Sequence, residues 1–66
     1  MNLQVASTIL VEMSIKDYDF KTLCVILPYS PLKIAKALWH LYEKNYIEEH
    51  ISGNYTLTNK GKAIQI

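Results

Sequence analysis

The sequence predicts a single domain over residues 1–66, mainly α-helical with one small β-hairpin. Two long stretches place their apolar residues at helical spacing, and a Ser-Pro pair marks the start of the second stretch. After residue 45 the apolar residues alternate instead, on both sides of a Ser-Gly-Asn turn. Half of the 66 residues are apolar and the formal net charge is +1, so we expect the chain to fold.

The first helix is expected over residues 2–16, with Asn2 as its cap. Its main apolar arc contains Val5, Ala6, Ile9, Leu10 and Met13. Further apolar side chains lie outside this arc, so the helix is more apolar than a surface helix needs to be. We therefore expect this helix to form the interface of a homodimer. The residues assigned to that interface are Leu3, Leu10, Val11 and Ile15.

A shorter second helix is expected over residues 20–27, because Pro28 ends the run. Either Asp17 or Asp19 can supply its capping carboxylate. Some apolar side chains on the second and third helices exceed what a small core can bury, and we expect them to form a patch for a protein partner. They are Val25, Ile26 and Trp39.

A third helix is expected over residues 31–45, because Ser30 is an N-cap residue and Pro31 takes a first-turn position that tolerates proline. Its apolar side is centred on Leu38, and Asn45 is a suitable left-handed terminator. The opposite side is polar and carries Lys33, Lys36, His40, Glu43 and Lys44.

The hairpin strands are expected near Tyr46–Ile51 and Tyr55–Thr58. A last helical turn, capped by Thr58, is expected over residues 59–64, although Gly61 weakens it. We expect aromatic side chains of the third helix and the hairpin to pack in or around the core. They are Trp39, Tyr42, Tyr46 and Tyr55.

Two strings of the sequence resemble parts of MarR-like and PadR-like transcriptional regulators. The first, FKTLCVILPYSPLKIAKALWHLYEKNYIEE from Phe20 onward, is similar to their helix-turn-helix core and ends in Leu41, Glu43, Lys44, Tyr46 and Ile47. The second, GNYTLTNKGK, is similar to their second wing strand, through Tyr55, Leu57, Thr58 and Gly61. The two strings cover about two thirds of the chain in the correct order. The resemblance implies a winged helix-turn-helix domain with three helices and a two-stranded wing.

The resemblance implies a regulator of transcription that binds duplex DNA as a homodimer, with the third helix in the major groove. Lysine and histidine can donate to guanine edges or phosphates, and a leucine can contact a thymine methyl group. Compact regulators of this kind are typical of viruses, plasmids and prokaryotes. The candidate DNA contacts are Tyr29, Ser30, Leu32, Lys33, Lys36, His40, Asn54, Lys60 and Lys62.

The charge distribution supports an alternative function. The chain has no Arg, and the hairpin carries Glu48 and Glu49 with no Arg or Lys between positions 48 and 59. DNA-binding domains of this size are usually strongly basic. A winged-helix module for protein interaction or assembly, which does not bind DNA, therefore stays open beside the regulator.

Other functional classes have little support in the sequence. No apolar run approaches the roughly 20 residues of a membrane helix and no signal-peptide pattern is visible, so we expect a cytoplasmic protein that is not in a membrane. The lone Cys24 cannot form an internal disulfide. The set His40, Glu43 and His50 is a weak metal motif, and no catalytic grouping or phosphate-binding glycine loop is present. We expect neither an enzyme, nor a metal, nor a cofactor.

Overall fold

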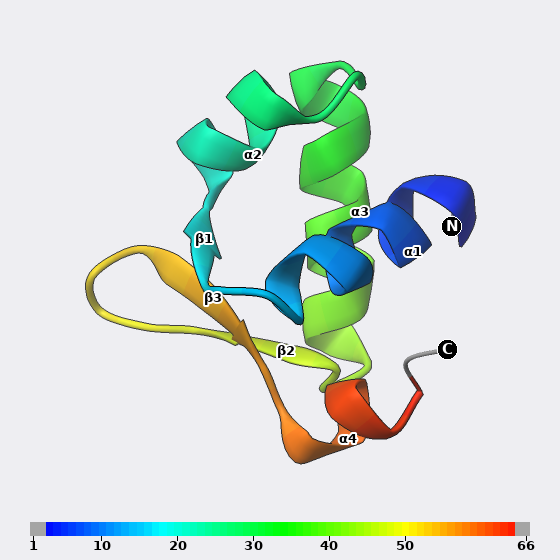
Figure 1. Ribbon diagram of the computed structural model, residues 1–66, viewed down its shortest axis with the longest axis vertical. Helices are drawn as coiled ribbons and strands as arrows, with labels where there is room; N and C mark the ends of the chain where they lie inside the picture. Colours follow the sequence, from blue (N-terminus) through cyan, green and yellow to red (C-terminus); the bar gives the residue numbers. More distant parts are fainter. Residues whose placement is uncertain (1–2, 65–66) are drawn as a thin grey trace.

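The computed structural model describes residues 3–64, which form four helices and a three-stranded antiparallel sheet (Figure 1). The predicted fold class, mainly helical with a small β component, is confirmed at this level. The expectation of two strands is wrong, because a third strand precedes the second helix. In chain order the elements are α1 (Leu3–Met13), β1 (Tyr18–Asp19), α2 (Phe20–Ile26), α3 (Pro31–Glu43), β2 (Ile47–Glu49), β3 (Asn54–Leu57) and α4 (Asn59–Ala63).

The sheet has the order β1-β3-β2, so the strand that comes last in the chain lies in the middle. Tyr55 of β3 pairs with Tyr18 of β1 on one side and with Glu49 of β2 on the other. Strand β1 contains two residues, and two residues are too few to produce a recognisable alternation. The sequence therefore predicts a helix break at this point but no strand.

Helix α1 packs on α3 and buries the predicted arc of Val5, Ala6, Ile9, Leu10 and Met13. The helix ends three residues earlier than expected, where a tighter turn begins with a hydrogen bond from the Ile15 N–H to the Glu12 carbonyl. Leu10 is 8% exposed and belongs to the core, which corrects its assignment to a dimer interface. The expected cap Asn2 lies outside the described residues.

Helix α2 is capped by Asp19, which settles the choice between Asp17 and Asp19. The Asp19 carboxylate accepts a hydrogen bond of 2.8 Å from the Thr22 N–H. Hydrogen bonding by the Thr22 side chain, and next by its backbone N–H, stabilises the charged carboxylate and lowers the pKa of Asp19 below its ordinary value. Asp19 thus ends β1 and begins α2 in one step.

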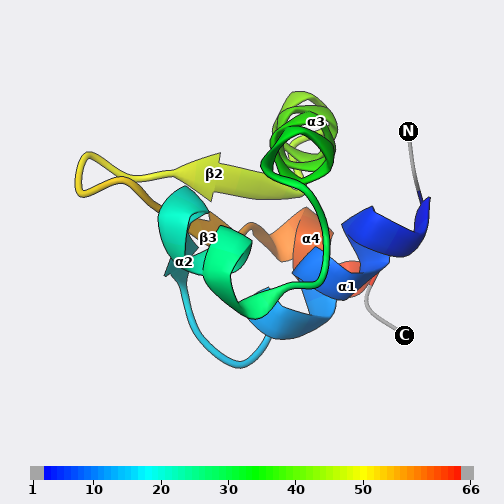
Figure 2. The ribbon, with the colours of Figure 1, turned by 90° about the horizontal axis from the view of Figure 1, so that it is seen from above.

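Helix α3 begins at Pro31 as the sequence predicts, ends at Glu43, two residues before the expected end, and has its buried side rotated. Ser30 caps it, and Asn45 adopts a left-handed conformation with φ 64° just beyond its end. Ala37 is buried, whereas Ala35 and Tyr42 are exposed. Figure 2 shows why: α3 packs on α1, α2 and the base of β2, while the turn of the hairpin projects away from it. The side of α3 that faces the hairpin is therefore left uncovered.

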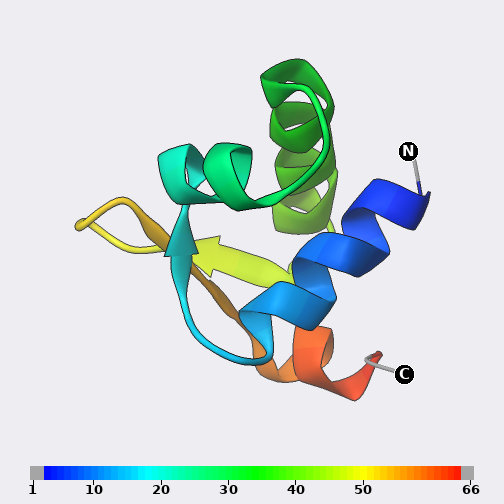
Figure 3. The same ribbon diagram turned by 45° about the horizontal axis from the view of Figure 1, so that its top comes forward.

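The core lies where α1, α2 and α3 meet the base of the hairpin (Figure 3). Burial of branched aliphatic side chains is the main favourable contribution to the stability of such a small domain. The largest fully buried side chains are Val5, Ile9, Leu23, Ile34, Leu41 and Ile47.

Helix α4 is fastened to the connection between α3 and β2. Thr58 caps it by accepting the Gly61 N–H at 3.1 Å, and the Thr58 hydroxyl donates to the Asn45 carbonyl. The backbone N–H of Thr58 donates to the Tyr46 carbonyl at 3.1 Å. Gly61 is buried against that same carbonyl: a Cβ at Gly61 would lie 2.0 Å from the Tyr46 oxygen. The glycine expected to weaken the turn is therefore what allows this close approach.

Candidate nucleic-acid interface

Helices α2 and α3 and the four residues 27–30 between them form a compact helix-turn-helix, whose second helix turns one side away from α1 (Figure 2). The first turns of α3 are open on that side. Leu32 is 65% exposed, and Lys33 and Lys36 are exposed as well. The three residues define a surface that we call the α3 start.

The α3 start combines two positive charges with one apolar side chain. Lys33 and Lys36 are three residues apart, so they lie on neighbouring positions of the helix surface. The first acidic residue after them along α3 is Glu43, about two turns further on. Lysine ammonium groups bind phosphates and guanine edges, and the Leu32 side chain suits a thymine methyl group. The surface is chemically suited to duplex DNA.

Ser30 and Tyr29, both predicted contacts, already have partners within the protein. The Ser30 hydroxyl oxygen accepts the Lys33 N–H at 3.3 Å. Tyr29 is half-buried, and its hydroxyl lies 3.4 Å from the Thr8 hydroxyl of α1. Because Thr8 already donates its hydrogen to the Gln4 carbonyl, Tyr29 must donate in this contact. Tyr29 thus ties the turn before α3 to α1.

His40 lies at the edge of the polar side of α3. It is half-buried and packs against Trp39 in an edge-to-face arrangement, with ring centroids 5.5 Å apart. His40 therefore lies between the polar side of α3 and the aromatic residues that face the hairpin.

The structure does not bring the other predicted DNA contacts to the α3 start. Asn54 begins β3 and pairs with Asp19, next to a carboxylate. Lys60 and Lys62 are exposed on α4, which lies at the far end of α3 (Figure 1). The Lys60 ammonium group lies 5.1 Å from the centre of the Tyr46 ring. The sequence could not reveal this separation, because it does not say where α4 lies relative to α3.

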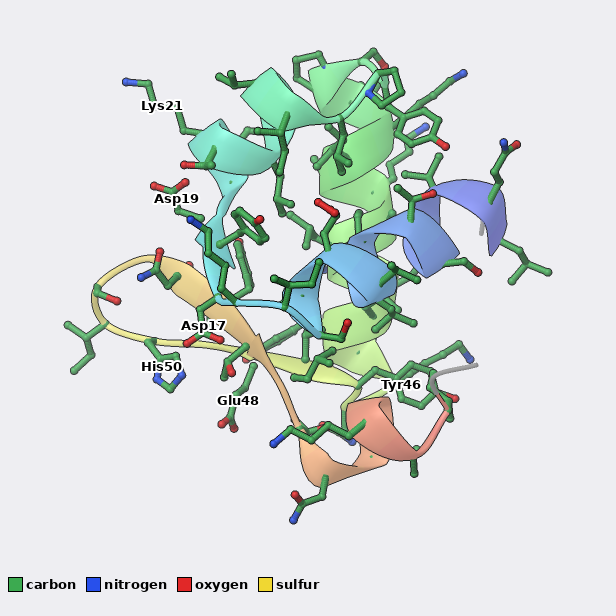
Figure 4. All side chains as sticks on the ribbon, viewed as in Figure 1. Asp17, Asp19, Lys21, Tyr46, Glu48 and His50 are labelled. Atoms are coloured by element: carbon green, nitrogen blue, oxygen red, sulfur yellow. The ribbon has the colours of Figure 1, made fainter. Side chains whose placement is uncertain are left out.

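The outer face of the hairpin carries Glu48 and no lysine of its own. Figure 4 shows Asp17, Glu48 and His50 on the same side of the sheet. Lys16 and Lys62 lie beside Asp17 and Thr56 on this side, so its charge is mixed. The hairpin turn has Gly53 at φ 93° and presents a fully exposed Ile51. Within residues 3–64, no three His, Cys, Asp or Glu side chains gather to hold a metal ion, so the weak metal motif is not assembled.

The remaining predicted interface residues are exposed, except Leu10. Leu3, Val11 and Ile15 are exposed apolar side chains spaced along and just beyond α1, and we call this set the α1 stripe. Val25, at 79%, is among the most exposed apolar side chains, and Ile26 is also exposed. Trp39 lines a groove to which neither Val25 nor Ile26 contributes.

That groove, between α3 and the hairpin, is a feature that the sequence analysis missed. We call it the aromatic groove; its volume is about 470 Å³. The expectation that Tyr42 packs in or around the core is wrong, since it is 53% exposed. Trp39 is 58% exposed, which agrees with its expected place in an apolar surface patch and not with packing in the core. Tyr46 and Tyr55 are half-buried against the core. The lining residues are Phe20, Ala35, Leu38, Trp39, Tyr42, Glu49 and Tyr55.

Comparison with known proteins finds no matching family model, no matching curated protein and no matching solved structure. Over residues 3–64, no helix combines the length and the apolar content needed to cross a bilayer.

Proposed function

We propose that the protein is a winged helix-turn-helix regulator that binds duplex DNA through the α3 start. The observation that carries this proposal is the exposed set of Leu32, Lys33 and Lys36 at the beginning of a capped helix that follows a short helix and a tight turn. The order of the elements and the β1-β3-β2 sheet support the winged-helix assignment. In this arrangement α3 enters the major groove.

Two lysines per copy, with no arginine, favour binding dominated by phosphate contacts. The affinity of one copy is therefore low, and two copies on one duplex gain through effective concentration. The α1 stripe is the surface proposed for such a homodimer. A regulator of this size acts by occupying its site on DNA.

The direct test is the fluorescence anisotropy of a labelled duplex, titrated with the protein at about 50 and about 200 mM salt. Each phosphate contact releases close to one counterion, so two contacts weaken binding roughly tenfold over this range, and the four contacts of a dimer weaken it roughly 100-fold. Folded protein that does not bind, or that binds equally at both salt concentrations, would contradict the proposal.

The alternative is an interaction module, and the exposed Val25 and Ile26 on α2 favour it. The two surfaces can be separated by sedimentation velocity at micromolar concentration. We expect wild-type dimers, monomers for Val11→Glu because a charge then lies within the α1 stripe, and dimers for the control Val25→Glu. The reverse pattern would move the interface to α2 and favour the alternative, and monomeric wild type would remove the dimer from the proposal.

A further inference from the structure

The aromatic groove takes its walls from four elements, and its aromatic rings come from three of them. Trp39 and Tyr42 line it from α3, Phe20 from the start of α2, and Tyr55 from β3. Tyr42 and Trp39 are three residues apart on the side of α3 that the hairpin leaves uncovered. The volume of the groove is about 470 Å³, which is within the range of small-molecule sites. Four aromatic rings thus border one open space.

Glu49 supplies the charge in this groove. Glu49 and Tyr55 are paired across β2 and β3, so their side chains emerge on the same face of the sheet. Burial raises the pKa of the Tyr55 phenol, and the nearby Glu49 carboxylate raises it further. None of the described residues that line the groove is a lysine. The groove is therefore negative and unsuited to phosphate.

We propose that the aromatic groove binds an organic ammonium ion, of the quaternary or methylated amine class, with Glu49 as its counter-charge. The faces of aromatic rings attract cations, most strongly those of Trp and Tyr. A methylated ammonium ion is large and weakly hydrated, so its methyl groups replace water against Trp39 and Tyr42. A small metal ion would find one carboxylate and would stay hydrated. This site is separate from the α3 start and goes beyond the proposed DNA binding.

Trp39 is the only tryptophan of the chain, so its fluorescence reports directly on the groove. The probe is choline, titrated at constant ionic strength against the neutral isostere dimethylbutanol, in which a carbon replaces the charged nitrogen. We expect choline to change Trp39 fluorescence saturably with a Kd of about 1–10 mM, and the isostere to bind several-fold more weakly. Equal binding of both compounds, or no saturable change with choline, would overturn the proposal.

Two variants keep Trp39 as the reporter. Glu49→Gln is expected to weaken choline binding about threefold, the size of an exposed charge pair. Tyr42→Leu, which keeps an apolar side chain, is expected to weaken it about fivefold. The matched control is Glu48→Gln, because Glu48 is the adjacent residue of β2 and points to the opposite face. If Glu49→Gln binds choline as well as Glu48→Gln does, Glu49 is not the counter-charge and the proposal fails.

Discussion

The variant Gly61→Ala is expected to lose about 2 kcal/mol of stability, although alanine is by far the better helix former. The added methyl group would lie 2.0 Å from the Tyr46 carbonyl oxygen and 3.0 Å from its carbon. Both atoms belong to the backbone, so no side-chain rotation relieves the overlap. The same carbonyl accepts a hydrogen bond from the Thr58 N–H, and the Thr58 hydroxyl donates one to the Asn45 carbonyl. Relief therefore requires α4 to move away from the connection between α3 and β2.

Thermal unfolding followed by circular dichroism measures this loss. For a domain of this size, about 2 kcal/mol corresponds to a fall in Tm of roughly 10 °C. Lys62→Ala is the matched control, because Lys62 is exposed on the same short helix and its replacement is expected to leave Tm nearly unchanged. If Gly61→Ala unfolds at the temperature of Lys62→Ala, the close packing of α4 on Tyr46 does not exist.

The starts of α2, α3 and α4 and the left-handed residue after α3 were predictable because their causes are local, whereas α1 ends three residues before the expected position. Ser30 and Pro31 start α3, Asn45 follows its end, and Thr58 caps α4, all as the sequence indicates. Each of these signals needs a side chain and a backbone group no more than a few residues apart. Even the open choice at α2 lay between two carboxylates, and Asp19 is the one with the correct spacing to Thr22.

The features that were missed depend on contacts between distant residues. Strand β1 exists because Tyr18 meets Tyr55, 37 positions later by their residue numbers. The need for glycine at position 61 comes from its close approach to the Tyr46 backbone, which no local pattern reveals. The side of α3 that is buried follows from where the hairpin goes, so the sequence could not show that Tyr42 would stay exposed and line one groove with Trp39.

The candidate DNA site also has one part that local spacing predicts and one part that depends on the tertiary fold. The residues at the start of α3 share one helix, so their joint exposure follows from helical spacing alone. The lysines of α4 were added from the order of elements along the chain, and their distance from the α3 start is a tertiary property (Figure 1). The aromatic groove required the mutual placement of α2, α3 and the hairpin, and no sequence signal defines that placement.

The double variant Lys33→Glu with Lys36→Glu is expected to weaken DNA binding by at least about 100-fold at about 50 mM salt. Two phosphate contacts account for that factor through the counterions that they no longer release, and the two new carboxylates add repulsion. Both positions are exposed and neither belongs to the core, so circular dichroism should show an unchanged fold. The affinity is measured by the anisotropy of a labelled duplex.

The control is Lys60→Glu with Lys62→Glu. Each exchange of lysine for glutamate removes two units of charge, so both double variants change the formal net charge from +1 to −3. A general electrostatic attraction would weaken equally in both, whereas a contact surface at the α3 start would weaken mainly in the first. The salt dependence separates these cases again, because the slope of log affinity against log salt should fall by nearly two per bound copy for the α3 variant and stay close to wild type for the α4 variant. Equal losses in the two variants would remove α3 as the contact helix and leave only charge-driven association with DNA.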